Sequence, residues 1–184
     1  MVDRTADPAG HLSDIDVRGV GRSDLNAISA LHEDAFGPGR FTRTAYRVRE
    51  GTPHFSPHCR AGWRGDALVG AVTMTAVTLG DATGAHWLLG PLAVRANANN
   101  KGLGQRLVKD ALRSVESACA TATVILVGDV EYYGRLGFEA VPRGTLLLPG
   151  PVDPSRLLIW RGSDGAREIP AGLIKSIATP TPAG

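Results

Sequence analysis

One stretch of the chain decides the fold, and it reads Leu92-Ala93-Val94-Arg95-Ala96-Asn97-Ala98-Asn99-Asn100-Lys101-Gly102-Leu103-Gly104-Gln105-Arg106-Leu107. An apolar segment passes through a polar turn with glycines into a helix whose apolar positions recur every three or four residues. The first N–H groups of a helix have no acceptor inside the helix, and the positive end of the helix dipole lies there. Such a turn can bind phosphate, but it can equally be a connection that needs glycine only to turn.

The glycines of this turn fit one class of phosphate site better than two others. A dinucleotide-binding turn needs G-x-G-x-x-G, and Leu107 takes the place of the third glycine. A Walker A loop needs G-x-x-x-x-G-K-S/T, a string that does not occur in the chain. A nucleotide-dependent enzyme built on Gly102 and Gly104 is therefore the weaker hypothesis. The turn that holds coenzyme A in acetyltransferases is the remaining class.

The strand and turn resemble the acetyl-CoA motif of the GNAT superfamily of N-acetyltransferases. Leu89–Val94 reads Leu-Gly-Pro-Leu-Ala-Val and is followed by a turn of the Q/R-x-x-G-x-G/A type. In that turn Asn99 takes the Gln/Arg position, and Gly102 and Gly104 are the glycines. Asn99 is short and uncharged, so the contacts expected from side chains are weaker than is usual in the family, whereas those from the main chain are kept.

A second motif strengthens the resemblance. The run Asp129–Phe138 is similar to the family signature Y-x-x-x-G-F, with Tyr133 at the tyrosine. By motif order the resemblance extends from about Ile15 to Trp160, and the motifs look most like a group of uncharacterised predicted acetyltransferases. It implies an acetyl-CoA-dependent N-acetyltransferase, with a non-catalytic module that binds or senses acyl-CoA as the alternative.

The resemblance also implies where acetyl-CoA, the acyl-donor substrate, is held. Family members split their sheet between the fourth and fifth strands, and the pantetheine arm enters the gap. A kink at Gly90-Pro91, where proline donates no ladder hydrogen bond, would force the strands apart. The residues expected to contact the donor are Leu92, Ala93, Val94, Asn99, Asn100, Lys101, Gly102, Leu103, Gly104, Gln105, Tyr132 and Arg135.

The chemistry implied is attack of an amine on a thioester. The oxyanion would meet a backbone donor near Leu92, and Tyr133 is the candidate general acid for the departing thiolate. Histidine suits the role of general base at neutral pH, and we name His86 for it. The alternatives are His54, His58, Glu33, Asp34 and a chain of water molecules.

The remaining patterns predict one α+β (mixed α/β) domain with a central, mostly antiparallel sheet flanked by helices. We expect strands near residues 15–20, 59–64, 67–79, 86–94, 124–127, 138–141 and 157–160, and helices near 25–35, 42–50, 104–118 and 130–136. Ser23 or Asp24 is the expected cap of the first helix. The domain would span residues 13–178, between a loose arm at 1–12 and a disordered tail at 179–184.

The composition limits the classes of partner that the sequence suggests. A formal charge of +2 over 184 residues gives no sign of a nucleic-acid surface. No stretch approaches the roughly 20 apolar residues that span a bilayer, and no signal peptide is evident. Cys59 and Cys119 have no metal-ligand spacing, so we expect no metal. These observations favour a cytoplasmic protein, and the high content of Ala, Gly and Arg suggests a bacterial one.

The amine acceptor carries no readable motif. The candidates are a small polyamine or aminoglycoside-like amine, an amino acid, or a lysine or N-terminus of a protein. We expect the acceptor site to be built from the first helices, the loop from His54 to His58 and the excursion near Pro149. Because dimers are frequent in the superfamily, the resemblance also raises a homodimer as one option.

Overall fold

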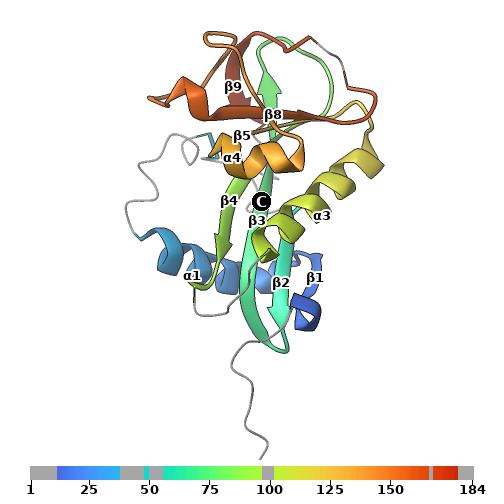
Figure 1. Ribbon diagram of the computed structural model, residues 1–184, viewed down its shortest axis with the longest axis vertical. Helices are drawn as coiled ribbons and strands as arrows, with labels where there is room; N and C mark the ends of the chain where they lie inside the picture. Colours follow the sequence, from blue (N-terminus) through green and yellow to red (C-terminus); the bar gives the residue numbers. More distant parts are fainter. Residues whose placement is uncertain (1–11, 38–47, 50–55, 97–101, 166–167, 178–184) are drawn as a thin grey trace, which may run out of the picture.

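The computed structural model describes residues 12–37, 48–49, 56–96, 102–165 and 168–177 (Figure 1). The described strands are β1 (Asp16–Gly19), β2 (Arg60–Arg64), β3 (Ala67–Leu79), β4 (His86–Val94), β5 (Thr123–Val127), β6 (Glu139–Ala140), β7 (Leu146–Leu147), β8 (Leu157–Arg161) and β9 (Gly172–Ser176). The described helices are α1 (Leu25–Phe36), α3 (Leu103–Ala118) and α4 (Val130–Tyr133), with short 3-10 turns η1 (Leu12–Asp14), η2 (Arg22–Asp24), η5 (Gly134–Leu136) and η6 (Pro154–Arg156).

The strands form one mixed sheet in the order β1-β2-β3-β4-β5-β8-β6. Neighbours along this order are antiparallel except β4 and β5, which are joined by α3 and run parallel. Strand β9 pairs with the far end of β3, and β7 pairs with β9. This is the mostly antiparallel α+β sheet that the sequence predicts.

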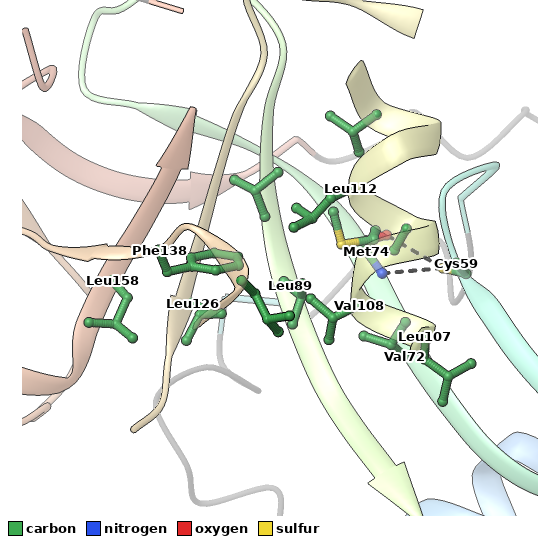
Figure 2. Close-up of a cluster of buried hydrophobic side chains, with 14 of the residues drawn as sticks. Cys59, Val72, Met74, Leu89, Leu107, Val108, Leu112, Leu126, Phe138 and Leu158 are labelled. Atoms are coloured by element: carbon green, nitrogen blue, oxygen red, sulfur yellow. Dashed lines mark hydrogen bonds between the residues drawn. The ribbon is translucent and has the colours of Figure 1, made fainter. Parts of the chain in front are cut away.

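The two long helices cover opposite faces of this sheet (Figure 1). Figure 2 shows Leu107, Val108 and Leu112 of α3 against side chains from β3, β4 and β5, and all three are buried. On the other face, Ile28 and Leu31 of α1 pack in a separate cluster with Leu68 and three alanines of the strands. The apolar stripe of α3 is therefore the face that fixes the helix on the sheet.

Strand β4 is kinked at the residues where the sequence predicts a kink. Across the β3–β4 ladder, Val72 lies opposite Leu92 and Met74 lies opposite Leu89. Two residues of β4, Gly90 and Pro91, therefore face a single residue of β3, which is the geometry of a β-bulge. Gly90 has a φ of 114°, a left-handed conformation that glycine adopts without cost.

Several local predictions differ from the structure. Asp24 does not cap α1: its carboxylate accepts from Gly21 N at 2.9 Å and pairs with Arg18 at 2.9 Å. The strand expected over 138–141 forms only at Glu139–Ala140. The sequence analysis also missed β7 and β9. The helix expected at 42–50 lies largely outside the described residues, as do arm residues 1–11 and the tail at 179–184, whereas Leu12 belongs to η1.

Candidate active site

The sheet opens between β4 and β5 beyond the bulge. The two strands pair only from His86 to Leu88 on β4 and from Thr123 to Ile125 on β5. The rest of β4, from Leu89 to Val94, pairs with β3 alone. The sheet is therefore split at the position that the resemblance implies.

Main-chain groups of β4 face this gap. Arg95 N donates to Val69 O at 2.9 Å. This bond shows which opposite pairs of the β3–β4 ladder are hydrogen-bonded and which are not. In an antiparallel pair, bonded and non-bonded positions alternate along each strand. Leu92 and Val94 fall at non-bonded positions, so their N–H and C=O groups point away from β3, toward the gap. Ala93 lies at a bonded position and its main chain faces β3.

The opposite side of the gap presents main-chain groups of β5. Gly128 N donates to Arg156 O at 2.9 Å, in register with the β5–β8 pairs. By the same alternation, the N–H and C=O groups of Val127 point away from β8 and toward β4. The gap is therefore bordered by polar main-chain groups on both strands.

Helix α3 begins beside the gap. Gly102 precedes its first turn with a φ of 90°, and the main chain at Gly104 is approached closely by another residue. A Cβ on Gly104 would lie 2.6 Å from the Tyr132 hydroxyl and 3.6 Å from Leu92 Cδ2. A side chain at Gly104 would therefore displace the Tyr132 hydroxyl from the start of α3.

The other residues expected to hold the donor differ in whether the structure describes them and in whether they line the cavity. Asn99, Asn100 and Lys101 lie outside the described residues. The Leu103 side chain is fully buried, so only its main chain could meet a ligand. Gln105 lines a separate hollow of about 520 Å³ on the outer side of α3. Arg135 is exposed on η5 and is not among the cavity-lining residues.

A cavity of about 970 Å³ occupies the gap. The split strands and α4 contribute Leu89, Gly90, Pro91, Leu92, Leu126, Val127, Gly128, Asp129, Tyr132 and Tyr133 to its lining. The rest of the lining is formed by Phe36, Arg49, Pro151, Val152, Asp153 and Arg156. The end of α1 and the excursion after Pro149, which we expected to build the acceptor site, thus line the cavity.

Tyr133 is held firmly in this cavity. Its ring makes edge-on contacts with Tyr132, at 4.8 Å between centroids, and with Phe138, at 5.7 Å. Burial raises the pKa of Tyr133 to about 12. The hydroxyl is therefore protonated at neutral pH and can donate a hydrogen bond.

Gly128 makes room for this tyrosine. A Cβ at Gly128 would lie 2.4 Å from Tyr133 Cε2 and 2.8 Å from Leu126 Cδ1. Neither the packed ring of Tyr133 nor a core leucine can move away freely, so the absence of a side chain at position 128 sets the position of Tyr133. A lone glycine after an apolar strand gave no sequence signal for this role.

We expect Gly128→Ala to lower the free energy of unfolding by about 1–3 kcal/mol, because it overpacks the core, and to reduce turnover by displacing Tyr133. Urea titration and steady-state assays measure the two effects. Gly134→Ala is the matched control, since Gly134 has helical backbone angles and no atom within 4 Å of an added Cβ. It should stabilise the protein by about 0.5–1 kcal/mol. Equal stability of the two variants would contradict the packing argument.

The structure does not bring the candidate bases to the cavity. His86 is buried at the start of β4, in the part still paired with β5, and burial lowers its pKa. Nδ1 of His58 lies 2.9 Å from Ser114 Oγ, and Asp34 pairs with Arg95 at 3.2 Å. His86, His58, Asp34 and Glu33 are not among the residues that line the cavity. His54 lies outside the described residues.

The carboxylates described in the cavity lining are Asp129 and Asp153. Oδ1 of Asp129 accepts from Glu131 N at 2.8 Å, and Oδ1 of Asp153 accepts from Ser155 N at 2.9 Å. Each therefore caps the helical turn that follows it. Among the described residues, no group of three or more His, Cys, Asp or Glu side chains is arranged to hold a metal ion.

Comparison with known proteins agrees with this architecture. Residues 25–138 match the Acetyltransferase (GNAT) family. The chain therefore belongs to the GNAT family of acetyltransferases, which confirms the resemblance seen in its motifs. We found no match among curated proteins. The described helices include none long and apolar enough to cross a membrane.

Several solved structures share this fold, including the following three. An Escherichia coli GNAT family N-acetyltransferase (YhbS) in complex with CoA is 23% identical, with a TM-score of 0.74 over 95% of this chain and 94% of that one. A Brucella melitensis family member in complex with acetyl-CoA is 19% identical, with a TM-score of 0.65 over 89% and 96%. Arabidopsis thaliana Naa50 with the bisubstrate analogue CoA-Ac-MVNAL is 15% identical, with a TM-score of 0.54 over 79% and 97%.

Proposed function

We propose that this chain is an N-acetyltransferase that takes its acetyl group from acetyl-CoA and transfers it to a primary amine. The observation that carries the proposal is the row of main-chain groups at Leu92, Val94 and Val127 that face the gap without a strand partner across it. A pantetheine arm carries amides, which can hydrogen-bond to such groups as an added strand would.

The described residues fit this donor at both of its ends. The start of α3, with Gly102 and Gly104, offers outward N–H groups to a pyrophosphate. The cavity of about 970 Å³ lies between the split strands and reaches Tyr133, so it has room for a thioester and an amine together. The two family members with CoA or acetyl-CoA in their structures share the fold that creates this gap.

The reaction is a direct attack by the amine nitrogen on the thioester carbonyl. The new C–N bond forms as the carbonyl π bond opens, and the tetrahedral oxyanion is met by the Leu92 N–H in this proposal. The C–S bond then breaks, and the sulfur leaves as a thiolate. The ammonium group loses one proton before attack, which leaves the free amine, and the nitrogen loses a second as the tetrahedral intermediate collapses to the amide. Water is the simplest base for the first proton, because no histidine lies among the described cavity residues.

Tyr133 would donate its hydroxyl hydrogen to the departing sulfur. A pKa of about 12 makes it a weak acid compared with a thiol, whose ordinary pKa is about 8.5. Its main contribution is therefore a hydrogen bond that stabilises the developing thiolate. Net proton transfer to sulfur is completed by the proton that the amine releases.

A thermal-shift comparison with acetyl-CoA, ATP and NAD tests the donor. We expect stabilisation by acetyl-CoA alone, because a ligand that binds only the folded state raises Tm. Release of free thiol with a panel of amines then tests catalysis. Stabilisation by ATP or NAD without any by acetyl-CoA would overturn the assignment. Binding of acetyl-CoA without transfer to any amine would favour the non-catalytic acyl-CoA sensor.

A further inference from the structure

The lining of the cavity carries charge of both signs. Arg49 and Arg156 contribute guanidinium groups, and Asp153 contributes a carboxylate. Asp129, at the start of α4, contributes a second carboxylate. This pattern bears on the acceptor, because an amine must pass between these groups to reach the thioester.

Arg49 lies at the bulge of β4. Its nearest guanidinium nitrogen is 3.5 Å from the position that a Cβ on Gly90 would take, and Leu92 N is 3.9 Å from the same position. The positive charge therefore lies beside the main-chain donor proposed for the oxyanion. An arginine keeps its charge at every relevant pH and presents a fork of N–H groups that matches a carboxylate.

Arg156 lies on the Tyr133 side of the cavity. Its Nε donates to Gly128 O at 3.4 Å, which holds the side chain beside the glycine on which Tyr133 packs. Its charge also acts on Tyr133, where it opposes the dominant effect of burial on the pKa. The two guanidinium groups therefore border the proposed reaction centre on its β4 side and on its α4 side.

The acceptor's own charge must suit these arginines. A polyamine carries no carboxylate, so it would leave Arg49 and Arg156 without an anionic partner and could pair only with Asp129 and Asp153 of the described lining. An amine that also carries a carboxylate would pair with a guanidinium through charge-assisted hydrogen bonds. Its ammonium group would meet the carboxylates of Asp129 and Asp153 before it loses a proton.

Building on the proposed function, we infer that the acceptor is a zwitterionic amine of the amino-acid class, with its carboxylate bound by Arg49 and Arg156. This excludes polyamines and aminoglycoside-like amines as preferred acceptors. A peptide N-terminus, which has no adjacent carboxylate, would also be a poor acceptor.

Matched acceptors test the inference. Each of a set of amino acids is compared with its own amide, which keeps the skeleton and the amine but removes the negative charge. Putrescine and spermidine are tested alongside as polyamine acceptors. The amide has the more readily deprotonated amine, so intrinsic reactivity favours it, and a preference for the carboxylate must come from the protein. We expect kcat/KM to be higher for the amino acids than for their amides and for both polyamines.

Arginine variants test which side chains cause the preference for amino acids over their amides. Arg49→Gln and Arg156→Gln should each raise KM for the amino acids by about 10- to 100-fold, the range expected for a lost hydrogen bond to a charged group, and should change KM for the amides little. Arg49→Lys should recover only part of the loss, because a point charge replaces a fork. Arg22→Gln, in an exposed turn that does not line the cavity, is the control and should change neither KM.

Calorimetric titration of amino acids into the CoA-loaded protein separates this inference from the proposed function. Binding that is lost in Arg49→Gln, together with no transfer to any amine, would support the zwitterion site and reject the enzyme. Transfer that prefers polyamines or amides, or amino acids that neither bind nor react, would overturn the inference.

Discussion

Tyr133→Phe should lower kcat about 100-fold while leaving the affinity for acetyl-CoA nearly unchanged. The variant removes one oxygen atom and keeps the ring that packs against Tyr132 and Phe138. A positioned proton donor contributes roughly 10²–10⁴-fold to a rate, and we expect the lower end because burial makes this phenol a weak acid. Single-turnover measurements with saturating acetyl-CoA isolate the chemical step.

The pH profile gives an independent check on the same residue. With a pKa raised to about 12, Tyr133 keeps its proton over the whole range in which the amine is titrated. The wild-type rate should therefore rise as the amine loses its proton and show no descending limb up to about pH 10. A descending limb near pH 8 that vanishes in Tyr133→Phe would show that the hydroxyl titrates far lower than its burial implies.

Tyr132→Phe separates the two neighbouring hydroxyl groups. Tyr132 reaches Gly104 at the start of α3, where the pyrophosphate is expected, so removal of its hydroxyl should alter acetyl-CoA affinity more than kcat. Equal losses of kcat in both variants, with affinity unchanged, would mean that the proton donor has not been assigned to the right tyrosine.

The parts of the fold that the sequence predicted are those fixed by local patterns. The stripe of α3 and the apolar run of β4 follow from their periodicity, and the kink follows from a proline that cannot donate to the ladder. By contrast, β9 (Gly172–Ser176) becomes a strand because it pairs with Val77–Leu79, almost a hundred residues earlier. Its own composition gives little sign of that partner.

The candidate site also has a part that local sequence patterns predict and a part that they do not. The proposed donor side lies on motifs that are contiguous in sequence, so Leu92, Gly104 and Tyr133 could be named from them. The proposed acceptor side is assembled from the end of α1, from Arg49 and from residues near Arg156, which only the tertiary fold brings together. Asp24 failed as a helix cap for a related reason, because Arg18 six residues earlier competes for its carboxylate.

Removal of the single N–H group of Leu92 should slow the reaction by roughly 10²–10³-fold, the usual effect of losing one oxyanion donor. Replacement of Leu92 by the corresponding α-hydroxy acid exchanges the amide N–H for an ester oxygen and keeps the side chain. The β3–β4 ladder should survive, because Leu92 lies at a non-bonded position. We therefore expect a loss of kcat with little change in Tm.

The same exchange at Ala93 is the matched control, because that residue lies one position along the same strand and its N–H faces β3. It should cost about 1 kcal/mol of stability through a lost ladder hydrogen bond and leave the chemical step nearly intact. If the Ala93 ester slowed turnover as much as the Leu92 ester, the rate would be reporting strand integrity and Leu92 would lose its role. If only the Leu92 ester is slow, the gap-facing amide is the group that meets the oxyanion, and the bulge at Gly90-Pro91 is the feature that makes it available.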